Sequence, residues 1–323
     1  MPERTSILAI RLSALGDIIH ALPAIGSLKQ SFPSSKLALL ISPRWLPIVE
    51  GNPHIDELIL FDRRSMAALL KVRLRLRRLE PALAFDFQGL VQSAILGRIA
   101  GAEKLFGFDR SVARESMASI FYTHRVAVRG PHRIERNLQL IAAAGASRLA
   151  DQAWIPLGRP EGRLPSTPFV LASPFAGWAG KQWPLTNYAA LAKLLAREGL
   201  QLVTNVPEER AAELAACDTL YPHTSSIQGL IDATRRAAAV IGVDSGPLHL
   251  AAALRKPGAA IFGPTDPRLT GPYGGTFSVL RTNSAETTYK RHSNVHVSMH
   301  AITPEQAAEA LLHSLAHSTV RGS

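Results

Sequence analysis

Short apolar runs alternate with amphipathic stretches along the first half of the chain, a rhythm typical of βαβ units. The apolar runs predict strands at 6–12, 36–42 and 83–87. The amphipathic stretches predict helices at 18–32, 65–79, 91–100 and 132–144. This alternation indicates a parallel sheet covered by helices.

The same rhythm returns after residues 150–167, which lack periodicity, are rich in Pro and Gly, and predict an interdomain linker. Beyond the linker, strands are predicted at 169–173, 201–205, 239–243 and 259–262. Helices are predicted at 185–198, 208–216, 227–237, 247–254 and 304–317. We therefore expect two α/β domains, residues 1–155 and 156–323, with a ligand site in the cleft between them.

Composition narrows the class of protein further. A chain of 323 residues with 46% hydrophobic and 19% charged residues has room for about two folded domains. The single cysteine, Cys217, cannot form an internal disulfide, which favours a reducing compartment. Arg11 and Asp17 interrupt the N-terminal apolar stretch before it could serve as a membrane span. A cytoplasmic location is the expectation.

Positive charge is concentrated in the first half of the chain. The formal net charge is +11, and residues 1–160 hold 22 Lys and Arg against 13 Asp and Glu, which leaves +9 there. An anionic partner is therefore expected for the first domain. One run contributes seven of these cations: Arg63, Arg64, Lys71, Arg73, Arg75, Arg77 and Arg78. It fits a solvated helix face, an anionic acceptor or a membrane surface; no nucleic acid is expected, since no aromatic interleaving accompanies it.

A carboxylate follows the first predicted strand. In the segment 13–20, Gly16 permits a tight turn and Asp17 lies where a general base would face a substrate hydroxyl. Helix capping by Asp17 is the alternative interpretation.

A second polar segment, 243–249, follows a later strand. Backbone N–H groups near Ser245 and Gly246 would form an anion site suited to a diphosphate, with His249 adding a donor beside Asp244. The alternative interpretation is helix capping plus one buried histidine.

Two further loops follow strands of the second half. In the Gly-rich segment 175–184, Lys181 could compensate charge on a leaving diphosphate, or it could be a solvated lysine beside a packed tryptophan. The segment 263–267, which contains Thr265, would extend this pocket or only turn the chain. His292, His296 and His300 have helical spacing, but their neighbours are poor helix formers, so no metal site is expected.

In this order, five segments resemble the lipopolysaccharide heptosyltransferases, inverting glycosyltransferases of the GT-B fold. The segments are 13–20, 86–90, 181–184, 244–249 and 263–267. The resemblance spans nearly the whole chain and implies an α/β protein of two Rossmann-like domains facing each other across a cleft. It also implies that the final helix, about 304–317, packs back on the N-terminal domain.

Within the family, residues 113–122 and the stretch with His132, Glu135 and Arg136 resemble the heptosyltransferase I subgroup. Two features depart from the family pattern. Ser245 stands where a threonine is common in type I enzymes, and residues 287–300 lack the cysteines that many relatives carry there.

The resemblance implies a role for each candidate residue. Asp17 would be the catalytic base, and Lys181 would assist catalysis and donor binding. The donor, ADP-heptose, would contact Asp244, Ser245, Gly246, His249, Glu208, Glu209 and Thr265. The acceptor, a Kdo-bearing lipid A precursor, would contact Ser13, Gly16, Arg63, Arg64, Gln88 and Arg114.

The same resemblance implies no metal and no further cofactor, a monomer, and a peripheral location on the cytoplasmic face of the inner membrane. Three alternatives stay open at this point. The first is a heptosyltransferase II or III or another GT-B transferase, the second is a nucleotide-sugar epimerase, and the third is a non-catalytic anion-binding protein.

Overall fold

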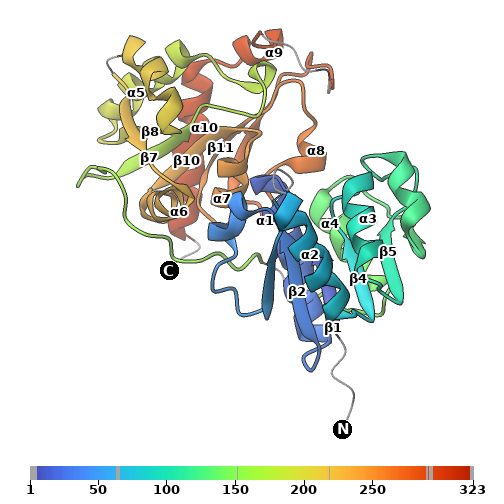
Figure 1. Cartoon of the computed structure of the whole chain (residues 1–323). Coiled ribbons are helices and arrows are strands. Elements are labelled where there is room, and N and C mark those ends of the chain that lie inside the picture. The colour runs from blue at the N-terminus through green and yellow to red at the C-terminus, as the bar shows by residue number, and fades with distance from the viewer. Residues whose placement is uncertain are drawn as a thin grey trace. The chain divides into compact units, whose positions relative to one another are not determined.

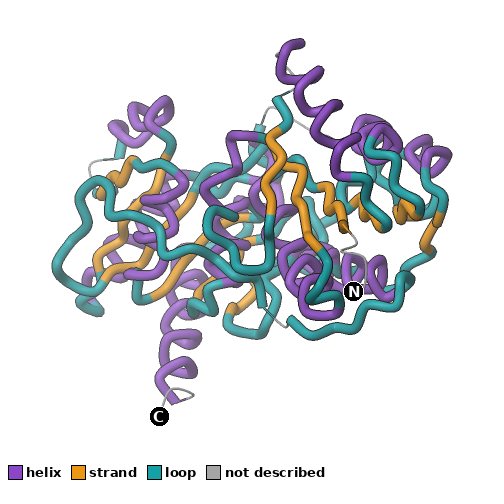
Figure 2. The backbone as a smooth tube through the Cα atoms, turned by 60° about the horizontal axis from the view of Figure 1, so that its bottom comes forward, coloured by secondary structure: helices purple, strands orange, loops and turns teal. Residues whose placement is uncertain are grey.

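The computed structural model describes residues 6–62, 66–150, 152–217, 219–288, 290 and 294–320. The chain divides into two compact units, Met1–Pro156 and Leu157–Ser323 (Figure 1). Each unit contains a six-stranded parallel sheet with helices on both of its faces (Figure 2).

The first unit has the strand order β3-β2-β1-β4-β5-β6. Its strands are β1 (Ser6–Ile10), β2 (Lys36–Ile41), β3 (Glu57–Leu60), β4 (Leu83–Asp86), β5 (Lys104–Phe108) and β6 (His124–Val126). Its helices are α1 (Leu15–Ser31), α2 (Met66–Leu79), α3 (Val91–Ile99) and α4 (Arg133–Ala142), with short 3₁₀ helices η1 (Pro43–Ile48) and η2 (Ser116–Phe121).

The second unit has the strand order β12-β11-β10-β7-β8-β9. Its strands are β7 (Phe169–Ser173), β8 (Gln201–Val206), β9 (Tyr221–Thr224), β10 (Ala239–Val243), β11 (Gly258–Ile261) and β12 (Phe277–Leu280). Its helices are η3 (Ala179–Lys181), α5 (Leu185–Arg197), η4 (Glu208–Ala216), α6 (Ile227–Arg236), α7 (Gly246–Ala253), α8 (Pro267–Thr270), α9 (Val297–His300) and α10 (Pro304–Val320).

Both sheets have the doubly wound order, in which the first and fourth strands of the unit are neighbours at the centre. In the first unit these strands are β1 and β4, and in the second they are β7 and β10. The connections that leave two such strands diverge to opposite faces of the sheet and open a crevice at their carboxyl ends. Each unit therefore has one position where the topology itself favours a ligand site.

Buried strand residues and the inward sides of the helices form the cores. In the first unit, α2, α3 and η2 pack on one face of the sheet, and α1 contacts α4. In the second unit, α5 and α10 share a core with β7, β10 and β11, while Leu248 of α7 packs beneath Ala260 and Phe262. The contacts of α10 include α5 and strands β10 to β12 of its own unit, so its expected packing on the first unit stays a prediction.

The pattern of hydrophobic residues predicted the central strands and missed several others. It gave no strand at β3, β5, β6, β9 or β12. Four of these, β3, β6, β9 and β12, are edge strands of three or four residues, too short for a clear period. The predicted helix at 208–216 is a 3₁₀ helix. Among the described residues, no helix combines the length and apolarity needed to cross a membrane.

Candidate active site

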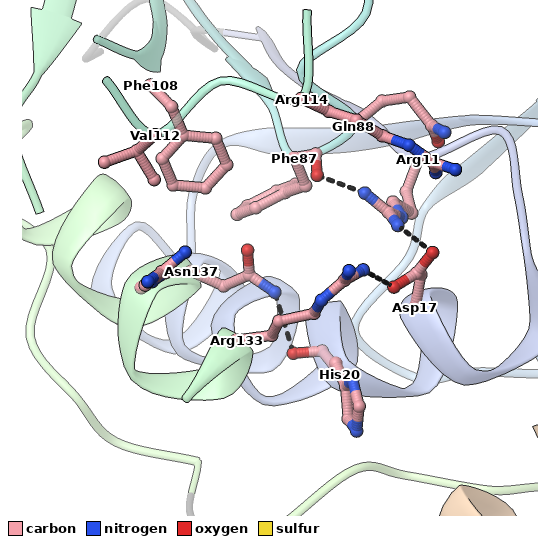
Figure 3. Close-up of a pocket in the computed structure, with 11 residues that line it drawn as sticks. Arg11, Asp17, His20, Phe87, Gln88, Phe108, Val112, Arg114, Arg133 and Asn137 are labelled. Carbon is pink, nitrogen blue, oxygen red and sulfur yellow. Dashed lines mark hydrogen bonds and ion pairs between the residues drawn. The ribbon is translucent and has the colours of Figure 1, made fainter. Parts of the chain in front are cut away.

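Asp17 lies in the first turn of α1, directly beyond the carboxyl end of β1. Its carboxylate forms an ion pair with Arg11 at 2.7 Å and a second one with Arg133 of α4 (Figure 3). Arg11 also donates a hydrogen bond to the carbonyl of Phe87, which follows β4. Helix α1 begins after Ala14, and no side chain caps its N-terminus. The carboxylate of Asp17 therefore pairs with the two guanidinium groups instead of capping α1.

Two opposing effects act on the Asp17 carboxyl. Burial raises its pKa, whereas the positive charges of Arg11 and Arg133 lower it. The arginines prevail and hold the pKa of Asp17 well below its usual range. Asp17 is therefore a carboxylate anion at neutral pH, and its negative charge is already matched by two cations.

A pocket of about 170 Å³ opens beside this ion pair (Figure 3). Its lining contains four arginines, Arg11, Arg114, Arg133 and Arg136, against one acid, Asp17. This excess of guanidinium groups suits a ligand that carries carboxylate or phosphate. The pocket is therefore a candidate anion site at the switch point of the first sheet.

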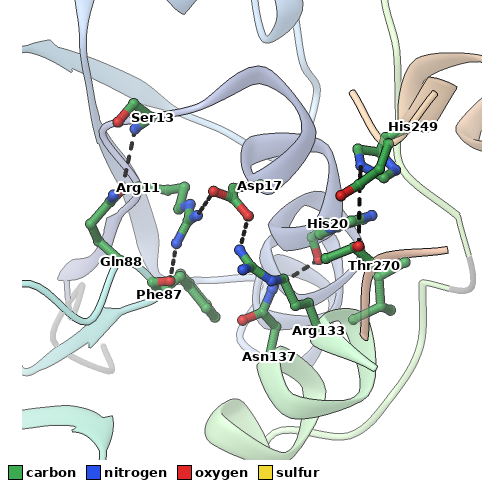
Figure 4. Close-up of polar contacts among 12 residues, drawn as sticks. Arg11, Ser13, Asp17, His20, Phe87, Gln88, Arg133, Asn137, His249 and Thr270 are labelled. Atoms are coloured by element: carbon green, nitrogen blue, oxygen red, sulfur yellow. Dashed lines mark hydrogen bonds and ion pairs between the residues drawn. The ribbon is translucent and has the colours of Figure 1, made fainter. Parts of the chain in front are cut away.

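Gln88 ties the loop after β4 to the loop after β1. Its Oε1 atom accepts hydrogen bonds from the backbone N–H groups of Leu12, at 3.1 Å, and Ser13, at 3.2 Å (Figure 4). The buried Asp86 in turn accepts hydrogen bonds from the Gln88 N–H and from the Tyr122 hydroxyl. These contacts fix the backbone on which the candidate acceptor residues lie.

The structure brings four predicted acceptor residues to this edge of the sheet. Gln88 and Arg114 line the pocket beside Asp17, Ser13 and Gln88 line a neighbouring hollow, and Gly16 is buried in the first turn of α1. Arg63 and Arg64 lie outside the described residues. Whether any of these residues contacts an acceptor stays a prediction.

Sequence reasoning missed both partners of Asp17. Arg11 continues an apolar strand and is only 5% exposed, and a charged residue in such a run is a usable signal of a buried ion pair. Arg133 lies 116 residues away from Asp17 in the chain, and no local pattern joins the two.

Asp244 lies at the switch point of the second sheet, directly after β10, the fourth strand of that unit. Lys181 contacts its Oδ2 atom at 2.9 Å, and His249 contacts Oδ1 at 3.3 Å. The hydroxyl of Thr270 donates to the same Oδ1 at 3.2 Å. Burial raises the pKa of Asp244, but the hydrogen bond from His249 and the charge of Lys181 outweigh burial and hold it well below the usual range.

Lys181 is held inside this cluster. Its side chain is 15% exposed, and the ammonium group lies 5.9 Å from the ring centre of Trp178. The alternative interpretation of a solvated lysine is therefore wrong. The neighbouring Trp183 is fully buried and donates its indole N–H to the carbonyl of Ile302, which anchors the segment.

Three buried hydroxyl groups follow neighbouring strands of the second sheet. They belong to Ser173 at the end of β7, Ser245 at the start of α7 and Thr265 after β11. Within the described part of the chain, none of these hydroxyl oxygens has a hydrogen-bond partner. Buried polar atoms are normally satisfied, so the three mark a place where a polar ligand would complete the bonding.

The start of α7 favours a ligand with negative charge. Ser245 occupies the N-cap position, but its hydroxyl makes no hydrogen bond to the helix. The N–H groups of the first turn, which begins at Gly246, point outward with the positive end of the helix dipole. Together with Lys181, they form a candidate diphosphate site.

The remaining predicted residues lie apart from this cluster. Glu208 and Glu209 are exposed at the start of η4, beyond the carboxyl end of β8. His296 caps α9 by accepting the N–H of Ser298, so it precedes the helix that His300 ends. His292 lies outside the described residues, and no group of three potential metal ligands occurs among the described ones.

Known proteins resemble this chain in sequence and in fold. The profile of glycosyltransferase family 9 (heptosyltransferase) matches residues 69–298. Lipopolysaccharide heptosyltransferase 1 of Pseudomonas aeruginosa is 31% identical over 290 residues, which is 83% of this chain and 81% of that protein. Lipopolysaccharide heptosyltransferase 1 of Escherichia coli K12 is 32% identical over 302 residues, 85% and 93% of the two chains.

Solved structures agree on the fold. Escherichia coli heptosyltransferase WaaC with ADP superposes with a TM-score of 0.76 at 24% identity and covers 96% of this chain and all of that one. A family 9 glycosyltransferase from Veillonella parvula reaches 0.81 at 18% identity, with 97% of each chain covered.

Two doubly wound α/β units make up the GT-B fold, and the solved heptosyltransferases share this architecture. The chain belongs to glycosyltransferase family 9, the heptosyltransferases. This confirms the predicted fold class and the predicted family.

Proposed function

We propose that this protein is a heptosyltransferase I, which transfers L-glycero-D-manno-heptose from ADP-heptose to a Kdo residue of Kdo-lipid A with inversion. The observation that carries this proposal is the ionised Asp17, set beside an arginine-lined pocket at the first switch point. The similarity to heptosyltransferase 1 enzymes over more than four fifths of the chain supports the choice of sugar and acceptor.

The second unit would bind the donor. The diphosphate fits between Lys181 and the first turn of α7, where Ser245 and Thr265 offer hydroxyls that have no other partner in the described chain. As the bond to the heptose breaks, negative charge grows on the diphosphate, and a fixed ammonium and helix N-terminus stabilise it. This set of donors accounts for leaving-group stabilisation without assigning a role to a metal ion.

The first unit would bind the acceptor and take up its proton. Carboxylate and phosphate groups of the acceptor suit the guanidinium groups of the pocket, among them Arg114. Asp17 would deprotonate the attacking hydroxyl, which then attacks the anomeric carbon from the face opposite the diphosphate. Each carboxylate oxygen already contacts an arginine in the ligand-free chain, which lowers the basicity of Asp17, so withdrawal of one arginine would make it a stronger base.

Arg133 is the arginine that can move away from Asp17. Its side chain is 42% exposed, whereas that of Arg11 is 7% exposed and is also bonded to the carbonyl of Phe87. An anionic acceptor would attract Arg133 and uncover Oδ1 of Asp17, which raises the basicity of the carboxylate only when the acceptor is present. A monomer on the cytoplasmic face of the inner membrane would meet such a lipid acceptor.

A transfer assay tests the proposal. Purified protein is incubated with ADP-heptose and Kdo-bearing lipid A in the presence of EDTA, and both ADP release and product mass are followed. A mass gain of one heptose is expected. ADP release without a product would support the assigned donor site and contradict the assigned acceptor. No reaction with any acceptor would overturn the proposed function.

A further inference from the structure

Exposed apolar side chains gather on three neighbouring elements of the first unit. Of the eleven large apolar side chains that are exposed among the described residues, six lie on α2, α3 and η2. They are Leu69, Leu70, Leu74, Ile95, Met117 and Ile120. Helix α3 contacts both α2 and η2, and all three elements pack their inner sides on the same face of the sheet. We call the outer sides of these elements the apolar-basic surface.

Helical geometry places two of these leucines at the outermost side of α2. Val72 and Leu76 of this helix are buried against the sheet. Leu70 and Leu74 are four residues apart, so they lie one turn above the other on the side away from that core, and they are 59% and 49% exposed. Figure 1 shows α2 over the strands of the first sheet. Ordinary core packing therefore does not explain these two leucines.

The 3₁₀ helix η2 also exposes large apolar side chains. Met117 is 60% exposed and Ile120 is 59% exposed, although Ala118 between them is fully buried in the core. Isolated apolar residues on a surface need no explanation, but a group on adjoining elements marks an interaction site.

The charge of α2 indicates what kind of partner the surface meets. The helix contains five cations and no acid: Lys71, Arg73, Arg75, Arg77 and Arg78. All five are exposed, and Arg75 also pairs with Glu57 of β3. Leucines flanked by lysine and arginine are the composition of a helix that lies in a membrane interface. A second copy of this surface would meet it with like charge, and a nucleic acid would leave the leucines unused.

We propose that the apolar-basic surface docks on an anionic lipid bilayer. Leu70, Leu74, Met117 and Ile120 enter the boundary between headgroups and acyl chains, and the cations of α2 contact the anionic headgroups. The docking itself is independent of any reaction. Its use rests on the proposed function, since a lipid-linked acceptor presents its sugar at the same boundary.

Vesicle co-sedimentation of the full chain without substrates tests the docking. The vesicles contain phosphatidylethanolamine with phosphatidylglycerol, or phosphatidylcholine alone. Two double variants, Leu70→Gln with Leu74→Gln and Met117→Gln with Ile120→Gln, probe the surface. The matched control replaces Leu157 and Val297 of the second unit with Gln, because these residues are 79% and 76% exposed and lie outside the surface.

We expect the wild type and the control to bind the anionic vesicles, with little binding to phosphatidylcholine. Each surface variant should bind at least about tenfold more weakly, because two apolar side chains are removed from the lipid. Equal binding of the variants and the wild type would overturn the proposal. Self-association of the wild type without vesicle binding would also overturn it and would indicate a second copy as the partner.

A second measurement separates this proposal from the proposed function. Transfer is compared between an acceptor embedded in vesicles and an acyl-free soluble acceptor. The surface variants should lose activity on the embedded acceptor and retain the wild-type kcat/KM on the soluble one. Loss of activity on both would contradict a docking role. If no acceptor is used at all, the proposed function fails while the vesicle result still decides the docking.

Discussion

Each unit has a carboxylate at the switch point of its sheet, after the first strand in one unit and after the fourth strand in the other, and the two are held in different ways. Asp17 is bound by two arginines, one of which, Arg133, is 42% exposed. Asp244 is bound by Lys181, His249 and Thr270, and the side chains of Lys181 and His249 are 15% and 6% exposed. Both carboxyls have a pKa well below the usual range.

Under the proposed function, this difference separates a reactive carboxylate from an anchoring one. Asp17 has one partner that solvent and ligands can reach, so its charge balance can change when an anion arrives. Asp244 has largely buried partners, and its contacts hold the ammonium of Lys181 and the imidazole of His249, which belongs to the first turn of α7. Under the proposed function, the switch point of the first sheet supports chemistry and that of the second sheet supports donor binding.

The largest effect is expected from removing the reactive carboxylate. Asp17→Asn should lower the single-turnover transfer rate by roughly 10³-fold, within the range of general base catalysis. Rapid-quench measurement of ADP release checks this. The matched control is Asp244→Asn, which should weaken donor binding instead. An Asp17→Asn enzyme with the wild-type rate would rule out Asp17 as the base.

Removal of the fixed cation should have the next largest effect. Lys181→Met should lower kcat by about 10²-fold, because the diphosphate loses one charge-stabilising group in the transition state. Steady-state kinetics with saturating donor measure this, and Lys193→Met, on exposed surface of α5, serves as the control. An unchanged kcat would show that Lys181 does not assist the reaction.

The hydroxyls without partners permit a more discriminating test. Ser245→Ala and Thr265→Val should each weaken ADP binding by about tenfold, since a hydrogen bond to a charged group is lost. The thermal midpoint of the ligand-free variants should not fall, because no bond of the ligand-free chain is removed. Calorimetry and thermal unfolding measure the two quantities. A lower midpoint with unchanged affinity would show that the hydroxyls are structural.

The smallest effect concerns the exposed partner of Asp17. Arg133→Met removes one positive charge and should raise the pKa of Asp17. Because the base must be ionised, kcat/KM of the variant should fall at a higher pH than that of the wild type as the solution is acidified. The free energy of unfolding should change by about 1 kcal/mol or less, since Arg133 is substantially exposed.

Arg11→Met is the matched comparison for that variant. Arg11 is buried and holds both Asp17 and the Phe87 carbonyl, so its removal should cost about 3 kcal/mol of stability in urea unfolding. Equal losses for the two arginine variants would contradict the contrast between a fixed and a removable partner.

The sequence predicted the features that depend on residues close together in the chain and missed those that depend on residues far apart in it. The central strands β1, β7 and β10 are continuous apolar runs, and the polar segments after them, with Asp17, Lys181 and Asp244, were therefore found at strand ends. Edge strands such as β6 and β9 are short and partly polar, so their place in a sheet depends on neighbours distant in the chain.

The pairing of charged residues could not be predicted from the sequence for the same reason. The ion pair of Lys181 with Asp244 spans 63 residues, and that of Arg133 with Asp17 spans 116. Only the strand order brings these residues together. The three hydroxyls without partners could not be predicted either, because an unsatisfied group is recognised only when all its neighbours are known.

Under the proposed function, Asp17 performs chemistry while the cluster of Lys181 and Asp244 binds the donor. Calorimetric ADP affinity of the Asp17→Asn and Lys181→Met variants tests it most directly, with transfer measured on the same samples. We expect wild-type ADP affinity with a transfer rate lowered by roughly 10³-fold for Asp17→Asn, and weakened ADP affinity for Lys181→Met. Loss of ADP affinity in Asp17→Asn, with unchanged affinity in Lys181→Met, would contradict it.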